Sequence, residues 1–268
     1  MPLLPGLLPG PSGNFGTAPE ERIAELLARP ASVHSVHRPV VALADGRCLG
    51  FQATVRIADR PEQSSAPWFR AAAQTGLSGR LGALALEAAL RERATMPGDR
   101  FLAVTLDPEA LGHPDVVAVL AAEDDVADLM LILVTADLPP GHRAEPVLAE
   151  LRARGLQLAI PAGMASLADL LAVERLHPDL ITLPVDLVRG VHQHRIRQRL
   201  VDIVVELADD LGAASLAEEV ESLDETQMLR TLGVRMASGW LFGRARPGFL
   251  APPTEVCEWL RLQQIELR

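Results

Sequence analysis

Short apolar runs alternate with segments of helical periodicity over most of the chain. The runs have the length that is typical of buried strands, and they occupy residues 101–106, 129–134, 156–160, 180–183, 214–217 and 234–237. Between them, apolar residues recur at helical spacing, as in segments 146–154, 167–176, 196–211 and 225–232. Strands that alternate with helices in this way predict a parallel sheet.

The chain enters this pattern through two apolar runs, 39–43 and 48–57, that flank a turn. The turn, Ala44-Asp45-Gly46-Arg47, contains the Asp-Gly pair that favours a tight β-hairpin. With these two strands the total reaches about eight, which predicts an α/β fold of the TIM-like (β/α)8 barrel type with an initial β-hairpin. An open doubly wound sheet is the alternative. No linker rich in Pro, Gly or Ser interrupts the middle, so we expect a flexible tail at 1–18 and a single domain at 19–268.

Two helical segments carry specific expectations about burial. Residues 68–93 are expected to form one helix, with a buried side that carries Leu77, Leu81, Leu84 and Leu90. In segment 196–211, one stripe with helical spacing is expected to face the sheet; its members are Ile196, Leu200, Ile203, Leu207 and Leu211. A helix nearer the N-terminus is expected to begin after Thr17, which suits an N-cap, and to end at Pro30.

The composition is that of an ordinary globular protein, yet it excludes several kinds of chemistry. Apolar residues make up 49%, which is sufficient for a large core. All 25 basic residues are arginine, so a phosphate loop of the GxxxxGK type and a lysine Schiff base are both excluded. Asn14 is the only asparagine. The two cysteines, Cys48 and Cys257, are too few for a disulfide framework or a four-cysteine zinc site.

The charge balance argues against nucleic acid and anionic membranes as the main partners. The 35 acidic and 25 basic residues give a net charge of −10 at pH 7, whereas such surfaces attract basic proteins. The apolar N-terminus lacks the basic n-region of a signal peptide, and no apolar run approaches the ~20 residues that span a bilayer. We therefore expect a soluble protein of the cytoplasm.

Six short motifs follow one another in order along residues 20–250. Arg-Pro-Val-Val-Ala-Leu at 38–43 and Asp-Gly at 45–46 precede Gly-Phe-Gln-Ala-Thr-Val-Arg at 50–56. Ala-Ala-Ala-Gln-Thr-Gly-Leu follows at 71–77, Ala-Glu-Glu-Val-Glu at 217–221, and Ser-Gly-Trp-Leu-Phe-Gly-Arg at 238–244, after Leu-Gly at 232–233. In order and spacing they resemble the motifs of the EAL domain, the cyclic di-GMP phosphodiesterase family. The resemblance implies the barrel predicted above.

The resemblance also implies a reaction, since members of that family hydrolyse a phosphodiester with two divalent metals. Such metals require carboxylate ligands at the carboxyl ends of the strands. In this chain the Glu of EAL falls on Gln52, and most of the remaining implied positions have also lost their ligands; they fall on Thr105, Leu133, Pro161, Ala162, Thr182 and Ser238. Glu218 and Glu221, in the Ala-Glu-Glu-Val-Glu motif, remain. We therefore expect no metal, no cofactor and no catalytic residue.

Four residues near the expected barrel mouth are candidates for ligand binding: Arg38, Arg56, Glu218 and Glu221. The resemblance implies that Arg56 contacts ligand phosphate, and together with Arg38 it would suit an anion. A structural ion pair between Arg56 and Glu218 or Glu221 is the alternative. The hydroxyl groups expected at the same mouth suit a neutral small molecule, with a filled, inert mouth as the alternative.

Two histidine pairs have spacings that occur in metal sites: His34 with His37, and His192 with His194. Neither pair has an acidic or cysteine partner nearby in sequence, so both are expected on the exposed surface.

The expected function is therefore that of a pseudoenzyme, with the barrel retained and the metal centre dismantled. It is expected to act as a protein-interaction or regulatory module in, or derived from, cyclic di-GMP signalling, through an unidentified protein partner or a homodimer. A receptor that binds cyclic di-GMP without hydrolysing it is the alternative. A third hypothesis is an active phosphodiesterase with a rearranged site, and a fourth is an unrelated barrel enzyme with Glu218 or Glu221 as general base.

Overall fold

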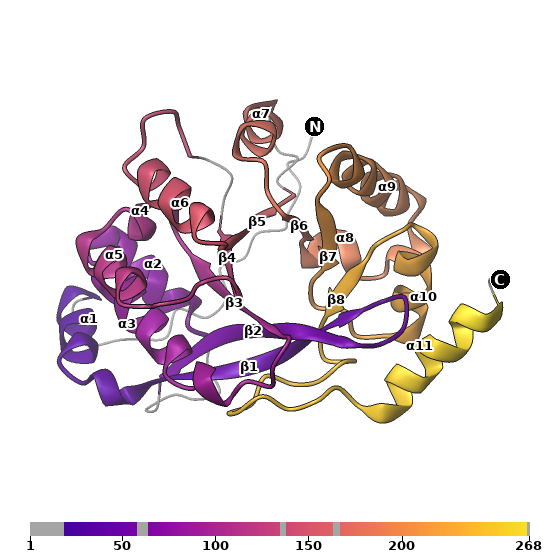
Figure 1. The fold of residues 1–268 in the computed structure, drawn as a ribbon, viewed down its shortest axis with the longest axis horizontal. Coiled ribbons are helices and arrows are strands. Elements are labelled where there is room, and N and C mark those ends of the chain that lie inside the picture. The colour runs from indigo at the N-terminus through magenta and orange to yellow at the C-terminus, as the bar shows by residue number, and fades with distance from the viewer. Residues whose placement is uncertain (1–18, 58–63, 135–137, 163–166, 267–268) are drawn as a thin grey trace, which may run out of the picture.

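The computed structural model describes residues 19–57, 64–134, 138–162 and 167–266. Within these residues, eight strands close into a barrel in chain order (Figure 1). β1 (Val33–Ala42) is antiparallel to both β2 (Cys48–Ile57) and β8 (Met236–Ser238), and the other neighbouring pairs are parallel. The predicted barrel and its initial hairpin are confirmed, and the open sheet is wrong. The expected tail at 1–18, with Thr17, lies outside the described residues.

The six later strands agree with the apolar runs to within two residues at either end. β3 is Phe101–Leu106, β4 is Leu129–Leu133, β5 is Gln157–Pro161, β6 is Leu180–Leu183 and β7 is Ala214–Ala217. Agreement is close because a strand that is covered on both faces has few polar positions, so its ends coincide with the return of polar residues.

Side chains of the strands alternate between the inside of the barrel and the helices around it. The inner cluster joins residues from six strands: Val40, Ala103, Met130, Ile132, Ala159, Leu180 and Leu216. Their sequence neighbours, Leu102, Leu131 and Leu133 among them, pack with the helices in a larger outer cluster. Because successive residues of a strand face opposite sides, this alternation decides which later residues reach the barrel mouth.

Helices cover the outside of the barrel, and several begin where the sequence provides a cap. Asp107 accepts a hydrogen bond from the Glu109 N–H at the start of α4, where Pro108 occupies the first turn. Ser222 and Glu225 form a reciprocal capping box at α10. The helices are α1 (Pro19–Leu27), α2 (Ala66–Gln74), α3 (Ser78–Leu90), α4 (Pro108–Leu111), α5 (Pro114–Ala121), α6 (Ala144–Ala153), α7 (Leu167–Leu176), α8 (Val185–Val188), α9 (Arg195–Asp210), α10 (Leu223–Thr231) and α11 (Thr254–Glu266).

The expectation of a single helix over 68–93 is wrong, because α2 ends at Gln74 and α3 begins at Ser78. Gly76 lies between them with φ +71°, a left-handed conformation that ends helices and that glycine adopts without strain. The Thr75 hydroxyl donates to the Ala71 carbonyl and so satisfies an acceptor at the end of α2. Leu81 and Leu84 are buried as expected, whereas Leu77 and Leu90 are only partly buried.

The buried face expected for α9 is also wrong. Ile196 and Ile203 are 77% and 49% exposed, while the other members of that stripe are partly buried. The residues that pack inward are instead Val201, Val204, Val205 and Ala208. Val201 and Val204 follow Leu200 and Ile203 by one position, about 100° further around the helix. The helix has apolar residues on two sides, and the smaller ones pack inward.

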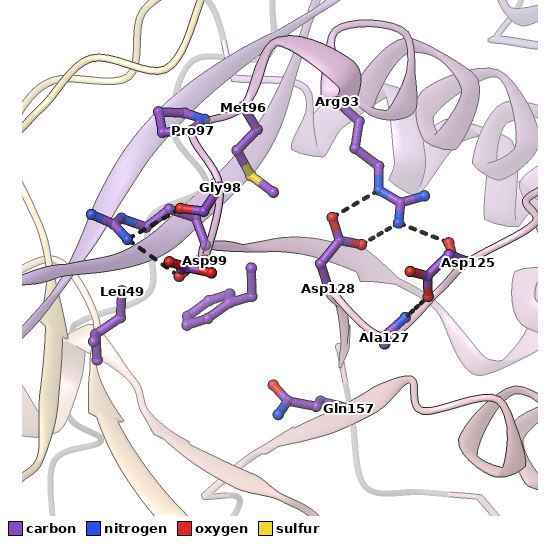
Figure 2. A pocket seen from close by; sticks show the side chains of 12 residues that line it. Leu49, Arg93, Met96, Pro97, Gly98, Asp99, Asp125, Ala127, Asp128 and Gln157 are labelled. Carbon is purple, nitrogen blue, oxygen red and sulfur yellow. Dashed lines mark hydrogen bonds and ion pairs between the residues drawn. The ribbon is translucent and has the colours of Figure 1, made fainter.

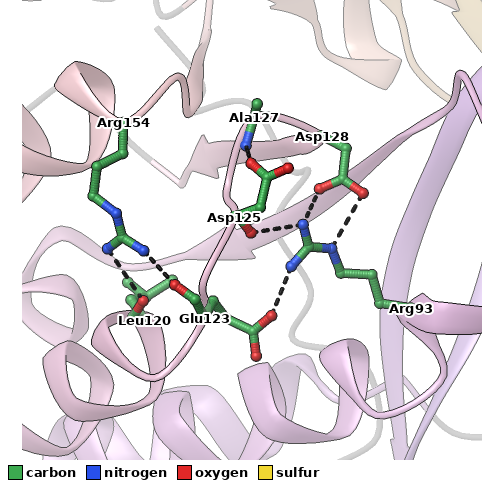
Figure 3. Close-up of polar contacts among 7 residues, drawn as sticks. All are labelled: Arg93, Leu120, Glu123, Asp125, Ala127, Asp128 and Arg154. Carbon is green, nitrogen blue, oxygen red and sulfur yellow. Dashed lines mark hydrogen bonds and ion pairs between the residues drawn. The ribbon is translucent and has the colours of Figure 1, made fainter.

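Arginine side chains join the loops at the amino ends of the strands (Figure 3). Arg93 donates to the Glu123 carboxylate at 2.6 Å and to the Asp125 carbonyl at 2.7 Å, and it also binds the Asp128 carboxylate. Arg154 donates to the carbonyls of Leu120 and Glu123. These bonds satisfy acceptors at the end of α5 and in the loop before β4. No helix of the described residues combines the length and apolar character needed to cross a membrane.

Candidate functional site

The carboxyl ends of the parallel strands open at one end of the barrel, which is where barrel enzymes place their active sites. Three side chains at this mouth form a chain of hydrogen bonds. Gln52 of β2 donates through Nε2 to Glu218 Oε1 at 2.9 Å. Ser238, the last residue of β8, donates through Oγ to Gln52 Oε1 at 3.2 Å. The oxygen and the nitrogen of the Gln52 amide therefore both have partners within the protein.

An ion pair joins β1 to the segment after β7 at the same mouth. Arg38 lies opposite Gln52 in the β1–β2 ladder, and its Nη1 donates to Glu219 Oε1. The Arg38 side chain is only 11% exposed, against 38% for Glu219. In the part of the chain that the structure describes, Arg38 Nε is a buried donor without an acceptor. The buried guanidinium therefore depends on Glu219 for its compensation.

Glu219 has a backbone conformation that is unusual for its residue type. Its φ is +56°, in the left-handed region where a side chain costs roughly 1–2 kcal/mol. The EAL motif that residues 217–221 resemble has glycine at this place, which adopts the conformation freely. The chain therefore carries strain at a position where it also gains an ion pair.

Glu218 is a carboxyl group in an unfavourable environment for its charge. Burial raises the pKa of Glu218 above its ordinary value, and the nearby charge of Glu219 raises it further. The hydrogen bond from Gln52 and the charge of Arg38 lower this pKa but do not cancel the effect of burial. Burial therefore outweighs the stabilisation that Arg38 and Gln52 give to the ionised form of Glu218.

The other two candidates, Glu221 and Arg56, make contacts of their own. Glu221 pairs with Arg189 at 2.5 Å in a solvent-exposed ion pair. Arg56, two positions beyond Thr54 on β2, is half-buried and donates to the Val55 carbonyl at 3.2 Å. The structure thus brings Arg38 and Glu218 together with the lost position Gln52, and it places Glu221 in a separate contact.

The remaining lost positions do not all reach the mouth. Thr182 and Ser238 are buried inside the barrel, and Thr105 is exposed at the end of β3. Pro161 ends β5 on the interior side, by alternation with Ala159. Leu133 and Ala162, however, pack in the outer cluster. By alternation with the inward Ile132, the interior position at the end of β4 belongs to Val134 rather than Leu133.

The residues at the mouth do not fit the two divalent cations that the sequence resemblance implies. Hard cations require several carboxylate or carbonyl oxygens that converge on one point. Here the positions carry hydroxyl groups, a proline and an amide, and the carboxylate of Glu218 is already hydrogen-bonded to Gln52. Across the described residues, no group of three or more His, Cys, Asp or Glu side chains is arranged to hold a metal ion.

The expectation that the histidine pairs lie on the surface is wrong for His37, which is 2% exposed. The segment after β8 covers its ring: Nδ1 lies 3.2 Å from the Gly248 carbonyl, and the Phe249 ring stacks on it with centroids 4.2 Å apart. Burial lowers the pKa of His37 below its ordinary value. No local pattern announces this contact, because it joins residues more than 200 positions apart.

A cavity of about 450 Å³ lies at the opposite end of the barrel, among the residues that precede β3 and β4 (Figure 2). Two of its carboxylates serve the framework, since Asp128 pairs with Arg93 and Asp125 accepts from the Ala127 N–H at 2.9 Å. In barrels of this type that end contributes to stability rather than to catalysis. The cavity is therefore not a candidate for the family reaction.

One contact at the mouth that sequence reasoning missed is the pair Arg38–Glu219. Glu219 was not among the expected site residues. The signal was present as two departures from the resembled motifs, an Arg where the first motif has Gln and a Glu where the fifth has Gly. Once the fold is known to bring the first and fifth motifs together, the two opposite charges that these substitutions introduce indicate an ion pair.

Proteins with related sequences place the chain in a family. The family model described as "EAL domain" matches residues 21–245. Among curated proteins, an uncharacterised protein of Azorhizobium caulinodans is 28% identical over 249 residues, which are 87% of this chain and 34% of that protein. The blue light- and temperature-regulated antirepressor BluF of Escherichia coli is 26% identical over 156 residues, which are 56% of this chain and 39% of BluF. The match therefore spans well under half the length of either relative.

Solved structures show the same fold. The manganese and cyclic di-GMP complex of Klebsiella pneumoniae BlrP1 at pH 6 superimposes with a TM-score of 0.70. Sequence identity is 29%, and the match covers 80% of this chain and 56% of that chain.

Proposed function

Because the chain belongs to the EAL domain family, we propose that it is a catalytically inactive EAL domain that acts as a protein-interaction or regulatory module in, or derived from, cyclic di-GMP signalling. In this proposal the domain acts by binding a protein partner, and formation of a homodimer is a second way in which it could act. The proposal also places the protein in the cytoplasm. It also takes residues 19–268 as a single domain.

The chemistry of the donor set at the mouth is the observation that carries this proposal. Two-metal hydrolysis depends on carboxylates that hold both cations on either side of the scissile phosphate. Gln52 is neutral, and its amide is engaged by Glu218 and Ser238. Thr105, Thr182 and Pro161 offer no charge. The single carboxylate of Glu218 supplies too few ligand oxygens for two divalent ions.

A protein partner is supported by one of the relatives. BluF is described as an antirepressor, a role that opposes a repressor. A barrel of this family that no longer needs its metals keeps its outer helices as a surface for such contacts. The match to BluF covers 56% of this chain, so the partner of this chain stays a proposal.

A non-hydrolysing receptor for cyclic di-GMP is the second candidate, and Arg56 is the residue that favours it. The resemblance gives Arg56 a phosphate contact, and the BlrP1 structure holds cyclic di-GMP. The pair Arg38–Glu219 weighs against this candidate, because it places a carboxylate beside the mouth and neutralises one of the two arginines. An anionic ligand gains less from a guanidinium that already has a carboxylate partner.

Two measurements on the pure protein test the proposal. Hydrolysis of cyclic di-GMP is followed by chromatography with magnesium or manganese, alongside a catalytically active family member as positive control. We expect no product, and turnover that depends on the added metal would refute inactivity. Calorimetry with cyclic di-GMP on the wild type and on Arg56→Ala separates the two candidates. Micromolar binding that is lost in the variant favours the receptor, and absence of heat favours the partner module.

A further inference from the structure

A cavity of about 270 Å³ lies at the amino ends of the strands, away from the mouth described above. Its walls come from three parts of the chain: the hairpin turn with the first residue of β2, Arg100 just before β3, and the start of α11. This cavity shares one lining residue, Arg100, with the larger cavity of Figure 2, and its other lining residues are different.

The charged residues that line this cavity are all basic. Arg47, Arg100 and Arg261 line it, and among the described residues no carboxylate does. This is unexpected in a chain with a net charge of −10, because three guanidinium groups that meet in one concave site repel one another unless an anion joins them. Three such groups are also an arrangement with which proteins bind phosphate.

Two of these guanidinium groups have no acidic partner within ion-pair distance among the described residues. The ion pairs found there involve neither Arg100 nor Arg261. Arg100 donates to the carbonyls of Gly98 and Asp99, at 3.4 and 3.2 Å. Arg47 pairs through Nε with Asp45 at 2.7 Å, which leaves its two terminal nitrogens for a ligand. Arg261 is also close enough to Asp45 to help lower the pKa of that carboxyl group, so one carboxylate beside the cavity offsets part of the charge of three guanidinium groups. Most of the N–H donors that an anion needs are therefore outside ion pairs.

The walls are held in place by close packing between the hairpin turn and α11. Gly46 has φ +71°, and a Cβ there would lie 2.8 Å from the Cys257 Cα atom. The turn and the helix thus touch backbone to backbone, which fixes Arg47 relative to Arg261. α11 begins at Thr254, which also lines the cavity, so the positive end of the helix dipole adds to the arginine charge.

We propose that this cavity binds a small phosphate-bearing anion through Arg47, Arg100 and Arg261. Each guanidinium presents paired N–H groups that match two phosphate oxygens. The site lies on the amino-terminal side of the barrel, so it would be occupied independently of any ligand at the mouth, and the proposal does not rest on the function proposed above.

The two cysteines of the chain give this site its own reporter. Cys48 and Cys257 are the only thiols, and both line the cavity. Burial raises the pKa of each thiol, against the opposing charges of Arg100 for Cys48 and Arg261 for Cys257. Cys48 is the more accessible of the two. Its rate of alkylation therefore reports on whether the cavity is occupied.

The test measures alkylation of Cys48 by N-ethylmaleimide in the full chain, with mass spectrometry to assign the residue. Sodium pyrophosphate and sodium phosphate are the probes, titrated at constant ionic strength against sodium chloride. We expect pyrophosphate to slow the reaction in a saturable way, and more effectively than phosphate. In Arg261→Gln the half-protecting concentration rises about tenfold, the loss expected for one charge-assisted hydrogen bond.

Arg199→Gln is the matched control, because Arg199 is also a helical arginine, 84% exposed on α9 and outside the cavity lining. It removes the same charge and should leave protection unchanged. The proposal is overturned if neither probe protects Cys48, if chloride protects equally at the same ionic strength, or if Arg261→Gln and Arg199→Gln shift the titration by the same factor. Calorimetry with pyrophosphate provides a second measurement that does not depend on thiol chemistry.

Discussion

The pair Arg38–Glu219 provides the sharpest test of how the mouth is stabilised. The perturbation is to restore the residues of the resembled motifs, Gln at 38 and Gly at 219, one at a time and together. Each substitution removes one charge, and Glu219→Gly also removes the left-handed strain. The three variants Arg38→Gln, Glu219→Gly and the double variant form a cycle that isolates the coupling between the two positions.

The magnitudes follow from burial and backbone geometry. In Glu219→Gly the Arg38 guanidinium, 11% exposed, loses its carboxylate; removing one partner of a fully buried pair costs ~3–5 kcal/mol, and partial exposure of Glu219 reduces this to about 2–3 kcal/mol. Relief of strain at φ +56° returns about 1 kcal/mol. We expect a net destabilisation of about 1–2 kcal/mol.

In Arg38→Gln the outcome differs, because the group left behind is the more exposed one. Glu219 can reach water, so the change in stability should stay within about 1 kcal/mol. In this background Glu219→Gly has no buried cation to expose, and only the strain relief remains. The same substitution should therefore stabilise by about 1 kcal/mol, which gives a coupling energy of about 2–3 kcal/mol.

Urea unfolding at pH 7.5, followed by far-ultraviolet circular dichroism, measures the four stabilities, with midpoints compared at equal slope. Thermal midpoints should move by roughly 2–4 °C per kcal/mol in a chain of this size. The decisive observation is the reversal of sign of Glu219→Gly between the two backgrounds. If the two single effects add to within about 0.5 kcal/mol, the pair contributes nothing and the role assigned to it at the mouth is wrong.

Three further predictions concern single positions. Gln52→Glu alone should not produce hydrolysis of cyclic di-GMP, measured by chromatography with manganese, because the other implied ligand positions still lack carboxylates. The raised pKa of Glu218 means that the folded state binds its proton more tightly than the unfolded state, so ionisation destabilises the fold as pH rises through the unfolded and then the folded pKa. Glu218→Gln should therefore stabilise at pH 7.5, and urea midpoints at pH 4 should show a smaller gain. Ser222→Ala removes the capping box of α10 and should cost about 1 kcal/mol, seen as a lower thermal midpoint. Gln227→Ala, at an exposed site of the same helix, serves as control.

The barrel could be predicted from the sequence because its strands are covered on both sides. Runs such as 101–106 are apolar at almost every position, and their order along the chain leaves few topologies. The buried faces of the helices were harder to predict than the strands. In α9 both Ile203 and Val204 are apolar, and periodicity cannot decide between two apolar sides when the choice depends on the space left by the sheet. Packing decides it, in favour of Val204.

The candidate site could be predicted in its losses but not in its new contacts. Motif positions are read along the chain, so the replacement of Glu by Gln52 is visible there. Whether Leu133 faces the inside or the outside of the barrel is not visible along the chain, because a shift of one residue moves a side chain from one side of the sheet to the other. The bond between Gln52 and Glu218 joins residues 166 positions apart, and only the closed barrel brings them together.

The substitutions at the mouth are consistent with a single electrostatic change. A carboxylate at position 52 beside Glu218 needs a cation between them, because an ionised Glu is only an acceptor and two acceptors in one site repel. With Gln52 no cation is needed there, because the amide Nε2 donates to Glu218 and the amide Oε1 accepts from Ser238. Arg38 then brings a cation into the mouth at the cost of a strained Glu219. A carboxylate restored at position 52 would therefore compete with Glu218 for the positive charge of Arg38. A single reversion at position 52 adds repulsion at the mouth and does not restore the set of metal ligands.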